Sequence, residues 1–400
     1  MIVFPPEVRA SGRGEFRIAA RVEPERDASN FPEELFFDVP DAYREAISPR
    51  SDAFLASLLL PAMNGHEHID VRGPISPRLA LGVDDYQRVF HSWFPRRFNT
   101  VDVRADHDGA VETGPTAGAV GAAFSGGIDS FYTLWSHCPE RDRRPHAAIS
   151  HALLVHGFDI PLDDTDAFEA LRASYGEMLA RVGVTLLTVR TNAASFAPAD
   201  NWGVFHGAPL IGVALLLGGL LSRFYVPASH TYRDLVPWGS GPTVDHLLAT
   251  ETLAVVHDGA TATRVAKTAV VGAWPETFGR LRVCPEATGL VNCCRCPKCI
   301  RTMVTLDMQG SLARHPTFPL PLERRAVRRC PYATDSELTF ARSIIEQARA
   351  KRRRDVVADV AIAVAVTRAR RAVRRGVRRA RVLLGRARRR VTGPRRITRR

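Results

Sequence analysis

A turn with two glycines follows directly after a short apolar run, and this junction limits the possible folds more than any other feature of the chain. The apolar run, Ala119–Phe124, suits a strand that is buried on both faces of a sheet. The turn reads Ser-Gly-Gly-Ile-Asp-Ser at positions 125–130, and Ser130–His137 can begin a helix. Adjacent glycines let the main chain approach a ligand without obstruction by Cβ atoms, so its amides can point at an anion. The junction predicts a strand–turn–helix unit that binds phosphate.

Two other phosphate-binding motifs do not occur in the sequence. A Walker loop requires Gly-x4-Gly-Lys-Ser/Thr, and a dinucleotide-binding fold requires Gly-x-Gly-x-x-Gly; the chain has neither. Asp129 would repel a phosphate unless a cation lay between them, so its position in the turn predicts magnesium.

Strand-like and helical segments alternate after the glycine turn. The expected strands are Ala119–Phe124, His151–His156, Val184–Val189, Phe224–Pro227 and Leu253–His257. The expected helices are Ser130–His137, Ala167–Val182 and Gly207–Leu221. This alternation is typical of βαβ units, so it predicts an α/β fold with a parallel sheet covered on both faces. Right-handed crossovers would place the loops after the strands at one edge, where ligands bind.

The remaining segments predict four parts in the chain. Residues 1–115 read as an N-terminal α+β domain, with strands at Glu15–Val22 and Leu35–Val39 and helices at Asp52–Leu60 and Asp84–Trp93. A linker or loop is expected at 108–118. The nucleotide-binding domain then covers 116–315, a helical segment covers 316–350, and a basic tail covers 351–400.

The basic charge of the chain is concentrated in that tail. The whole chain has 55 Lys and Arg against 42 Asp and Glu, a net charge of +13, but Lys351–Arg400 alone holds 20 of the bases and only two of the acids. The tail is expected to form a basic amphipathic helix up to Gly385 or to be a solvated, disordered segment, and the solvated reading is slightly favoured. Contact with an anionic membrane surface or with nucleic acid stays open.

Five of the seven cysteines lie within 16 residues, which argues for a metal site in a reducing compartment. Cys284, Cys293, Cys296 and Cys299 have short spacings that suit tetrahedral zinc, and four thiolates leave no open position, so a structural site is expected. Cys294 breaks this rhythm, although an exchange of roles with Cys293 stays open. An iron–sulfur cluster is a weaker alternative. With no secretory signal and no apolar run long enough to span a bilayer, the sequence predicts a cytoplasmic protein.

The strand, the Ser-Gly-Gly-x-Asp-Ser turn and the helix resemble those of the N-type ATP pyrophosphatase (PP-loop) family. The resemblance covers about residues 117–311, and the four-cysteine spacing is similar to that of the 7-cyano-7-deazaguanine synthase-like members. It implies a HUP-type nucleotide-binding core, with ATP, magnesium and zinc as cofactors. In that family the loop holds the β,γ-pyrophosphate while the substrate attacks the α-phosphate. The resemblance gives this role to Ser125, Gly126, Gly127, Asp129 and Ser130.

Further site residues follow from the same resemblance and from the loops after the expected strands. His156 and Asp159 follow the second strand, where relatives bind adenine and ribose, and Lys267 matches a lysine that contacts phosphate. Asp129 and Lys267 are therefore the expected catalytic residues. The substrate-pocket candidates are His206, Ser229, His230, Arg233 and Arg264. After the second strand the synthase carries a Tyr-Gly-Gln-Arg-His-type segment that this chain lacks, so a purine-like substrate is not implied.

The resemblance implies an AMP-forming ligase that adenylates a small molecule, most often a carboxylate, and releases pyrophosphate. Free ammonia, an amine or no nitrogen at all could complete the reaction, because no glutaminase signature is present. An adenylating carboxylate epimerase, which shares the Asn/His-Gly loop and the late cysteine cluster more loosely, is one alternative. A tRNA-modifying PP-loop enzyme is a second, and a regulatory module that binds ATP without turnover is a third. The oligomeric state, including a homo-oligomer, stays open.

Overall fold

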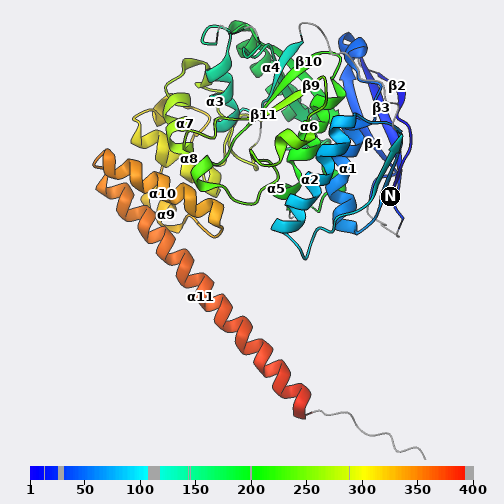
Figure 1. Ribbon diagram of the computed structural model, residues 1–400. Coiled ribbons are helices and arrows are strands. Elements are labelled where there is room, and N and C mark those ends of the chain that lie inside the picture. Colours follow the sequence, from blue (N-terminus) through cyan, green and yellow to red (C-terminus); the bar gives the residue numbers. More distant parts are fainter. Residues whose placement is uncertain are drawn as a thin grey trace, which may run out of the picture.

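The computed structural model describes residues 1–391 except 13, 26–30, 107–117, 143, 145, 199–200 and 288, with side chains as far as residue 373. Apart from Gly118, the expected linker at 108–118 lies outside the described residues. The chain forms a body of helices packed on a large sheet, and its last long helix projects away from that body (Figure 1).

Eleven strands among the described residues form one mixed sheet. Ten of them follow one another in the order β11 (Ala254–Asp258), β10 (Leu221–Pro227), β7 (Ala119–Ala123), β8 (His151–His156), β9 (Thr185–Thr191), β4 (Glu34–Pro40), β3 (Glu15–Glu23), β1 (Ile2–Val3), β5 (Ile69–Pro74) and β6 (Val103–Asp106). The remaining strand, β2 (Glu7–Gly12), pairs with β3.

The five strands from β11 to β9 are all parallel, which confirms the predicted mixed α/β fold with a mostly parallel sheet. Numbered in chain order, their arrangement is 3-2-1-4-5, so the chain changes direction across the sheet between β7 and β10. In doubly wound sheets, ligands bind beyond the carboxyl ends of the strands at such a switch point. The turn at 125–130 follows β7 and therefore lies at this point.

Helices cover both faces of the sheet (Figure 1). One face carries α1 (Asp52–Gly65), α2 (Pro77–Trp93), α5 (Trp202–Phe205) and α6 (Gly207–Leu216). The other face carries α3 (Ile128–His137), α4 (Thr165–Arg181), α7 (Arg264–Val271) and α8 (Pro297–Met308). A third cluster packs α8 against α9 (Arg324–Arg329), α10 (Asp335–Ala350) and α11 (Arg354–Val391). Short 3-10 helices occur at Asp41–Ala46, Ala193–Phe196, Tyr232–Asp234, Asp245–Leu248, Pro275–Thr277 and Leu312–Arg314.

The alternation of side chains along the strands explains why both faces are apolar. In β8, Leu153 and Val155 belong to the core under α1 and α6, whereas Ala152 and Leu154 belong to the core under α3 and α4. Successive side chains of a strand point to opposite faces, so a continuous apolar run fits a strand covered on both sides. This is the pattern from which the strands were predicted.

Several predicted helix boundaries differ from the observed ones: the helix expected at Asp52–Leu60 extends to Gly65, and two further differences have an evident physical cause. The helix expected to continue to Leu221 ends at Leu216, because two glycines follow and Leu221 already begins β10. The helix expected from Asp84 begins at Pro77, where the Ser76 side chain accepts a hydrogen bond from the amide of Leu79. A proline in the first turn after a serine N-cap is a common helix start.

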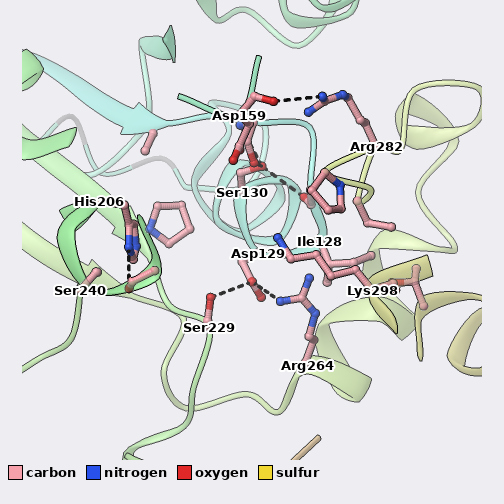
Figure 2. A pocket seen from close by; sticks show the side chains of 18 of the residues that line it. Ile128, Asp129, Ser130, Asp159, His206, Ser229, Ser240, Arg264, Arg282 and Lys298 are labelled. Carbon is pink, nitrogen blue, oxygen red and sulfur yellow. Dashed lines mark hydrogen bonds and ion pairs between the residues drawn. The ribbon is translucent and has the colours of Figure 1, made fainter. Parts of the chain in front are cut away.

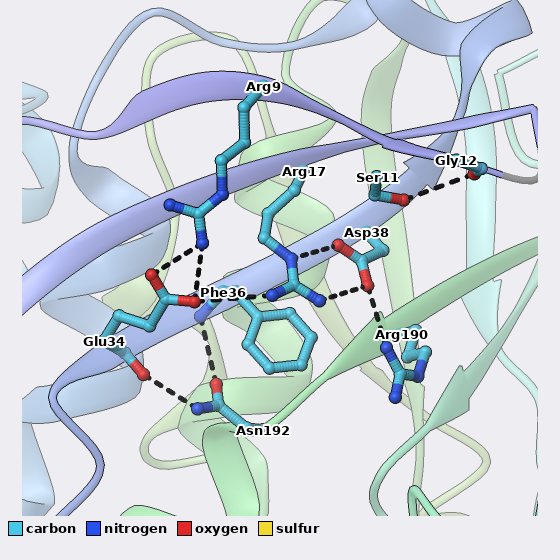
Figure 3. Close-up of polar contacts among 9 residues, drawn as sticks. All are labelled: Arg9, Ser11, Gly12, Arg17, Glu34, Phe36, Asp38, Arg190 and Asn192. Carbon is cyan, nitrogen blue, oxygen red and sulfur yellow. Dashed lines mark hydrogen bonds and ion pairs between the residues drawn. The ribbon is translucent and has the colours of Figure 1, made fainter.

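Polar side chains join the N-terminal strands to the parallel part of the sheet (Figure 3). Asp38 of β4 is buried and accepts hydrogen bonds from Arg17 of β3 at 2.6 and 2.8 Å and from Arg190 of β9 at 3.1 Å. Directly after β9, Asn192 accepts a hydrogen bond from the amide of Phe36 and donates one to the carbonyl of Glu34. Only two residue pairs of β4 and β9 are in register. The side chains of Asp38 and Asn192 therefore add to the few main-chain contacts between the two parts of the sheet.

The basic tail begins as part of the folded body. Asp359, near the start of α11, is buried and accepts hydrogen bonds from Arg324 and Arg328 of α9, and Val360 and Ala363 are also buried. The helix expected to reach Gly385 ends at Val391. Among the described residues, no helix is both long enough and apolar enough to pass through a bilayer.

We expect Asn192→Ala to lower the free energy of unfolding by about 2–4 kcal/mol, because it leaves the Phe36 amide and the Glu34 carbonyl without their partner at a buried junction. Urea denaturation measures this change. Asn64→Ala is the control, since Asn64 is only partly buried and accepts a single hydrogen bond, from Arg97. An equal effect of the two substitutions would contradict the role assigned to Asn192.

Candidate functional site

A cavity of about 530 Å³ opens beyond the carboxyl ends of β7, β8 and β10. Figure 2 shows Asp129 and Ser130 in its middle, His206 and Ser240 on one side, and Arg264, Arg282 and Lys298 on the other. A volume of this size lies in the range of small-molecule sites. Of the predicted nucleotide- and substrate-binding residues, those that line the cavity are Ser125, Gly127, Asp129, Ser130, Asp159, His206, Ser229, His230 and Arg264. The predicted metal ligand Cys284 lines it as well.

The glycine turn adopts a conformation that requires glycine. Gly126 has a φ of +73°, and a Cβ atom at this position would overlap the hydroxyl of Tyr175. The carbonyl of Gly126 accepts a hydrogen bond of 2.9 Å from the amide of Arg282. Gly127 is the N-cap of α3, and the Ser130 hydroxyl accepts from the amide of Ser125 while donating to the Gly127 carbonyl. The turn is therefore fixed from both sides.

The N-terminus of α3 faces the cavity. Gly127, Ile128, Asp129 and Ser130 all line it. The first amides of an α-helix have no acceptor inside the helix, and the helix dipole makes this end attractive to negative charge. The ten-residue helix therefore presents main-chain donors to the cavity.

Asp129 is the centre of a cluster of charges at the floor of the cavity. Its Oδ2 accepts hydrogen bonds from Arg264 at 2.7 Å and from Ser229 at 3.3 Å. Its Oδ1 is buried, has no hydrogen-bond partner among the described residues, and lies 3.7 Å from Nζ of Lys267. Ser229 follows β10 and Arg264 begins α7, so three separate elements meet at this carboxylate.

Lys267 lies beneath the cavity and does not line it. Its side chain is only 1% exposed, and Nζ donates a hydrogen bond to the carbonyl of Ala228. Burial lowers the pKa of this lysine, and the negative charge of Asp129 raises it in part. Lys267 therefore does not line the cavity itself, but it contacts Asp129, which does.

Two other predicted residues also lie away from the cavity. The ring of His156 is buried against Phe168, and its Nε2 lies 2.8 Å from the carbonyl of Pro161, so this histidine holds the loop that carries Asp159. Arg233 is on the surface, with its side chain 61% exposed and paired with Asp234 and Glu346.

The two histidines that do line the cavity belong to an aromatic wall. His230 stacks on Phe340 of α10, and burial lowers its pKa to about 4, so it is neutral near pH 7. Its Nδ1 has no hydrogen-bond partner among the described residues. The ring of His206 lies between those of Trp202 and Trp238, and burial lowers its pKa as well.

Several lining residues were missed by the sequence analysis. Arg282 was not singled out, although it stands two residues before the first cysteine of the cluster. Lys298 and Arg301 lie in the first turns of α8, which was predicted only as a helix docked on the core. The N-terminal turns of α10 supply Thr334, Ser336, Glu337 and Phe340. A signal for α10 was present, since Thr334 and Glu337 form a capping box.

The four predicted cysteines come together beside the cavity. The sulfur atoms of Cys284, Cys293, Cys296 and Cys299 all lie within 4.8 Å of one another. Main-chain amides of residues 286, 295, 296 and 299 donate hydrogen bonds to these sulfur atoms, as suits thiolates. The cluster could therefore hold a metal ion such as zinc.

Cys294 stands outside this cluster. It has a φ of +58°, and its buried Sγ donates a hydrogen bond to the carbonyl of Asn292 instead of turning towards the other sulfur atoms. Of the two neighbouring cysteines whose roles were left open, Cys293 joins the cluster.

We expect Gly126→Ala to lower the free energy of unfolding by about 3 kcal/mol or more, because the new Cβ both requires an unfavourable φ and overlaps Tyr175. Gly279→Ala is the matched control. Gly279 has nearly the same φ of +76° but open space around it, so only the backbone cost of about 1–2 kcal/mol applies. Urea denaturation of both variants separates the backbone cost from the cost of the overlap with Tyr175. An equal loss of unfolding free energy in the two variants would show that the contact with Tyr175 is unimportant.

Comparisons of the chain with protein-family models, with curated proteins and with solved structures gave no match.

Proposed function

We propose that this protein adenylates a small molecule, most favourably a carboxylate, by breaking ATP between its α and β phosphates. The observation that carries the proposal is the N-terminus of α3 and its glycine turn, which face a ligand-sized cavity at the switch point of the parallel sheet. The resemblance of the turn to the PP-loop supports the same reaction.

The phosphates of ATP would lie over the glycine turn. Amides of the first turn of α3 and the hydroxyls of Ser125 and Ser130 supply donors on this floor. The loop that carries Phe158 and Asp159 forms the adjacent wall, where adenine and ribose would bind. The rings of Phe158 and Trp202 pack against each other with their centroids 5.0 Å apart, and together they would give a planar base an aromatic surface to contact.

The donor set fits magnesium at one point. Oδ1 of Asp129 is a buried carboxylate oxygen without a hydrogen-bond partner among the described residues. Magnesium is commonly held by one or two carboxylates together with water and substrate phosphates. When bound, the ion would offset negative charge on the phosphates. Arg264 and Ser229 hold Asp129 in place, and Lys267 is a positioning residue whose Nζ lies 3.7 Å from Oδ1 of this carboxylate.

In the reaction, a carboxylate oxygen of the acceptor attacks the α-phosphorus of ATP. The bond from that phosphorus to the oxygen bridging it to the β-phosphate breaks, and pyrophosphate leaves from the glycine turn. The turn and the amides of α3 bind the leaving pyrophosphate in line with the attack, which is a contribution of orientation and charge stabilisation. The acyl adenylate then remains in the cavity for a second step.

The cysteine cluster would hold zinc in a structural role. Four cysteine ligands complete a tetrahedral zinc site and leave no position for water or substrate. Cys284 also lines the cavity, so the metal would stabilise one of its walls.

We expect the protein, incubated with ATP, magnesium and a panel of small carboxylates, to produce AMP and pyrophosphate with at least one of them. Asp129→Asn should lower this rate on the order of 100-fold, because the phosphates lose the cation that this carboxylate holds. Chromatography of the nucleotides together with a pyrophosphate assay gives both quantities.

Asp163→Asn is the control for that experiment, since Asp163 is exposed in the same group of loops and does not line the cavity. Circular dichroism confirms that each variant is folded. Formation of ADP and phosphate would contradict the proposed reaction. ATP binding without pyrophosphate release with any acceptor would favour the regulatory module.

We expect about one zinc ion per chain by elemental analysis, since the four thiolates form one closed site. Cys293→Ser should lose most of the metal, whereas Cys294→Ser should retain it, because only Cys293 belongs to the cluster. Iron in place of zinc, or equal metal loss in both variants, would contradict this assignment.

A further inference from the structure

Arg282 is a buried arginine in the wall of the cavity. It is 7% exposed and lines the cavity. An arginine side chain carries five N–H donors and is always charged. Here Nε donates to the carbonyl of Gly289 at 3.2 Å and Nη2 donates to the carbonyl of Asp159 at 3.4 Å. Among the described residues, no acceptor is present for Nη1.

The other two arginines of the cavity wall, unlike Arg282, each form an ion pair with a carboxylate. Arg264 is paired with Asp129 at 2.7 Å, and Arg301 is paired with Glu337 at 3.2 Å. No carboxylate of the described residues lies at ion-pair distance from Arg282. A buried cation without a counter-charge is costly for the folded protein, so a ligand that carries the missing charge would be stabilised here.

The main chain fixes the position of Arg282 relative to the glycine turn. Its amide donates to the carbonyl of Gly126, so the guanidinium and the anion-binding amides belong to one hydrogen-bonded unit. Figure 2 shows Arg282 near Asp159, separated from Arg264 by the N-terminus of α3. The two arginines therefore flank the place where the phosphates would lie.

Hydrogen bonds of Asn292 connect the residues on both sides of Arg282 to the cysteine cluster. The side-chain oxygen of Asn292 accepts hydrogen bonds from the amides of Val283 and Cys284, and its nitrogen donates to the carbonyl of Leu281. Asn292 directly precedes Cys293, so the segment on both sides of Arg282 is tied to the cluster.

We propose that Arg282 binds the two terminal phosphates of the nucleotide and the pyrophosphate formed from them. This inference rests on the proposed function and adds a binding residue to it. The guanidinium matches oxyanions with two parallel N–H donors, and phosphate oxygens over the glycine turn would replace the missing carboxylate. The carboxylate of the acceptor would also accept two parallel N–H donors, so the experiment compares binding of phosphate groups with binding of the acceptor.

The test measures the binding of magnesium pyrophosphate to the full chain by isothermal titration calorimetry, and the KM values for ATP and for an acceptor. We expect Arg282→Met to weaken pyrophosphate binding and to raise the KM for ATP, each on the order of ten- to 100-fold. Arg282→Lys, which keeps the charge but loses the paired donors, should fall between. The KM for the acceptor should stay unchanged.

Arg280→Met is the matched control. Arg280 lies two residues earlier, contacts Ser174 and Glu177, and does not line the cavity, so its replacement should leave pyrophosphate affinity unchanged. The melting temperature (Tm) of each variant shows whether Arg282 acts in pyrophosphate binding or stabilises the folded protein. Since Arg282→Met removes an uncompensated buried charge, its Tm should not fall below that of Arg280→Met.

Wild-type pyrophosphate affinity in Arg282→Met would overturn the assignment, and so would a rise confined to the KM for the acceptor. A lower Tm with unchanged affinity would show a structural role instead. If Arg282→Met does not fold, unchanged affinity in Arg282→Lys also overturns the proposal. If the wild-type chain binds neither pyrophosphate nor ATP, the proposed function itself fails.

Discussion

The close contact between Gly126 and the hydroxyl of Tyr175 is the constraint on which the site depends. A side chain at position 126 would overlap this tyrosine, which is itself buried against Phe124 and Phe131. The turn therefore packs directly on Tyr175 of α4, and the N-terminus of α3 that follows the turn lines the cavity. A glycine here therefore serves two purposes, because it permits the left-handed φ and also brings the loop and the core together.

Much of the fold could be predicted from the sequence because local patterns specify it. The apolar run at 151–156 corresponds residue for residue to β8, and the other predicted strands of the parallel sheet overlap the observed ones. Strands β7 and β8 are buried on both faces, and such burial leaves a clear apolar signature. The spacing of the cysteines predicted the cluster for a similar reason, since metal ligands near one another in sequence need little help from the rest of the chain.

The site was predicted less completely, because its side chains come from distant elements. Ser125 and Asp129 were found from the glycine-turn motif, and Ser229 and Arg264 were found from their positions after strands at the ligand edge. Lys267 was also found, but its sequence position did not reveal that its side chain would be buried beneath Asp129. Arg282 and the first turns of α8 and α10 reach the cavity only through packing of the C-terminal segments. The capping box marks where α10 begins, but no local pattern shows where these segments pack.

The continuous sheet has a consequence for how the molecule would unfold. Strands from the first 106 residues and strands from 119–258 share one sheet, and their side chains share one core, in which Phe37 and Leu55 lie with Val155 and Phe224. A shortened chain that begins at β7 would leave the edge of β9 without a partner and the apolar surface of α6 in water. Exposed edges of this kind favour aggregation. The two halves should therefore melt as one cooperative unit, so the half of the chain that carries the cavity depends on residues far from it.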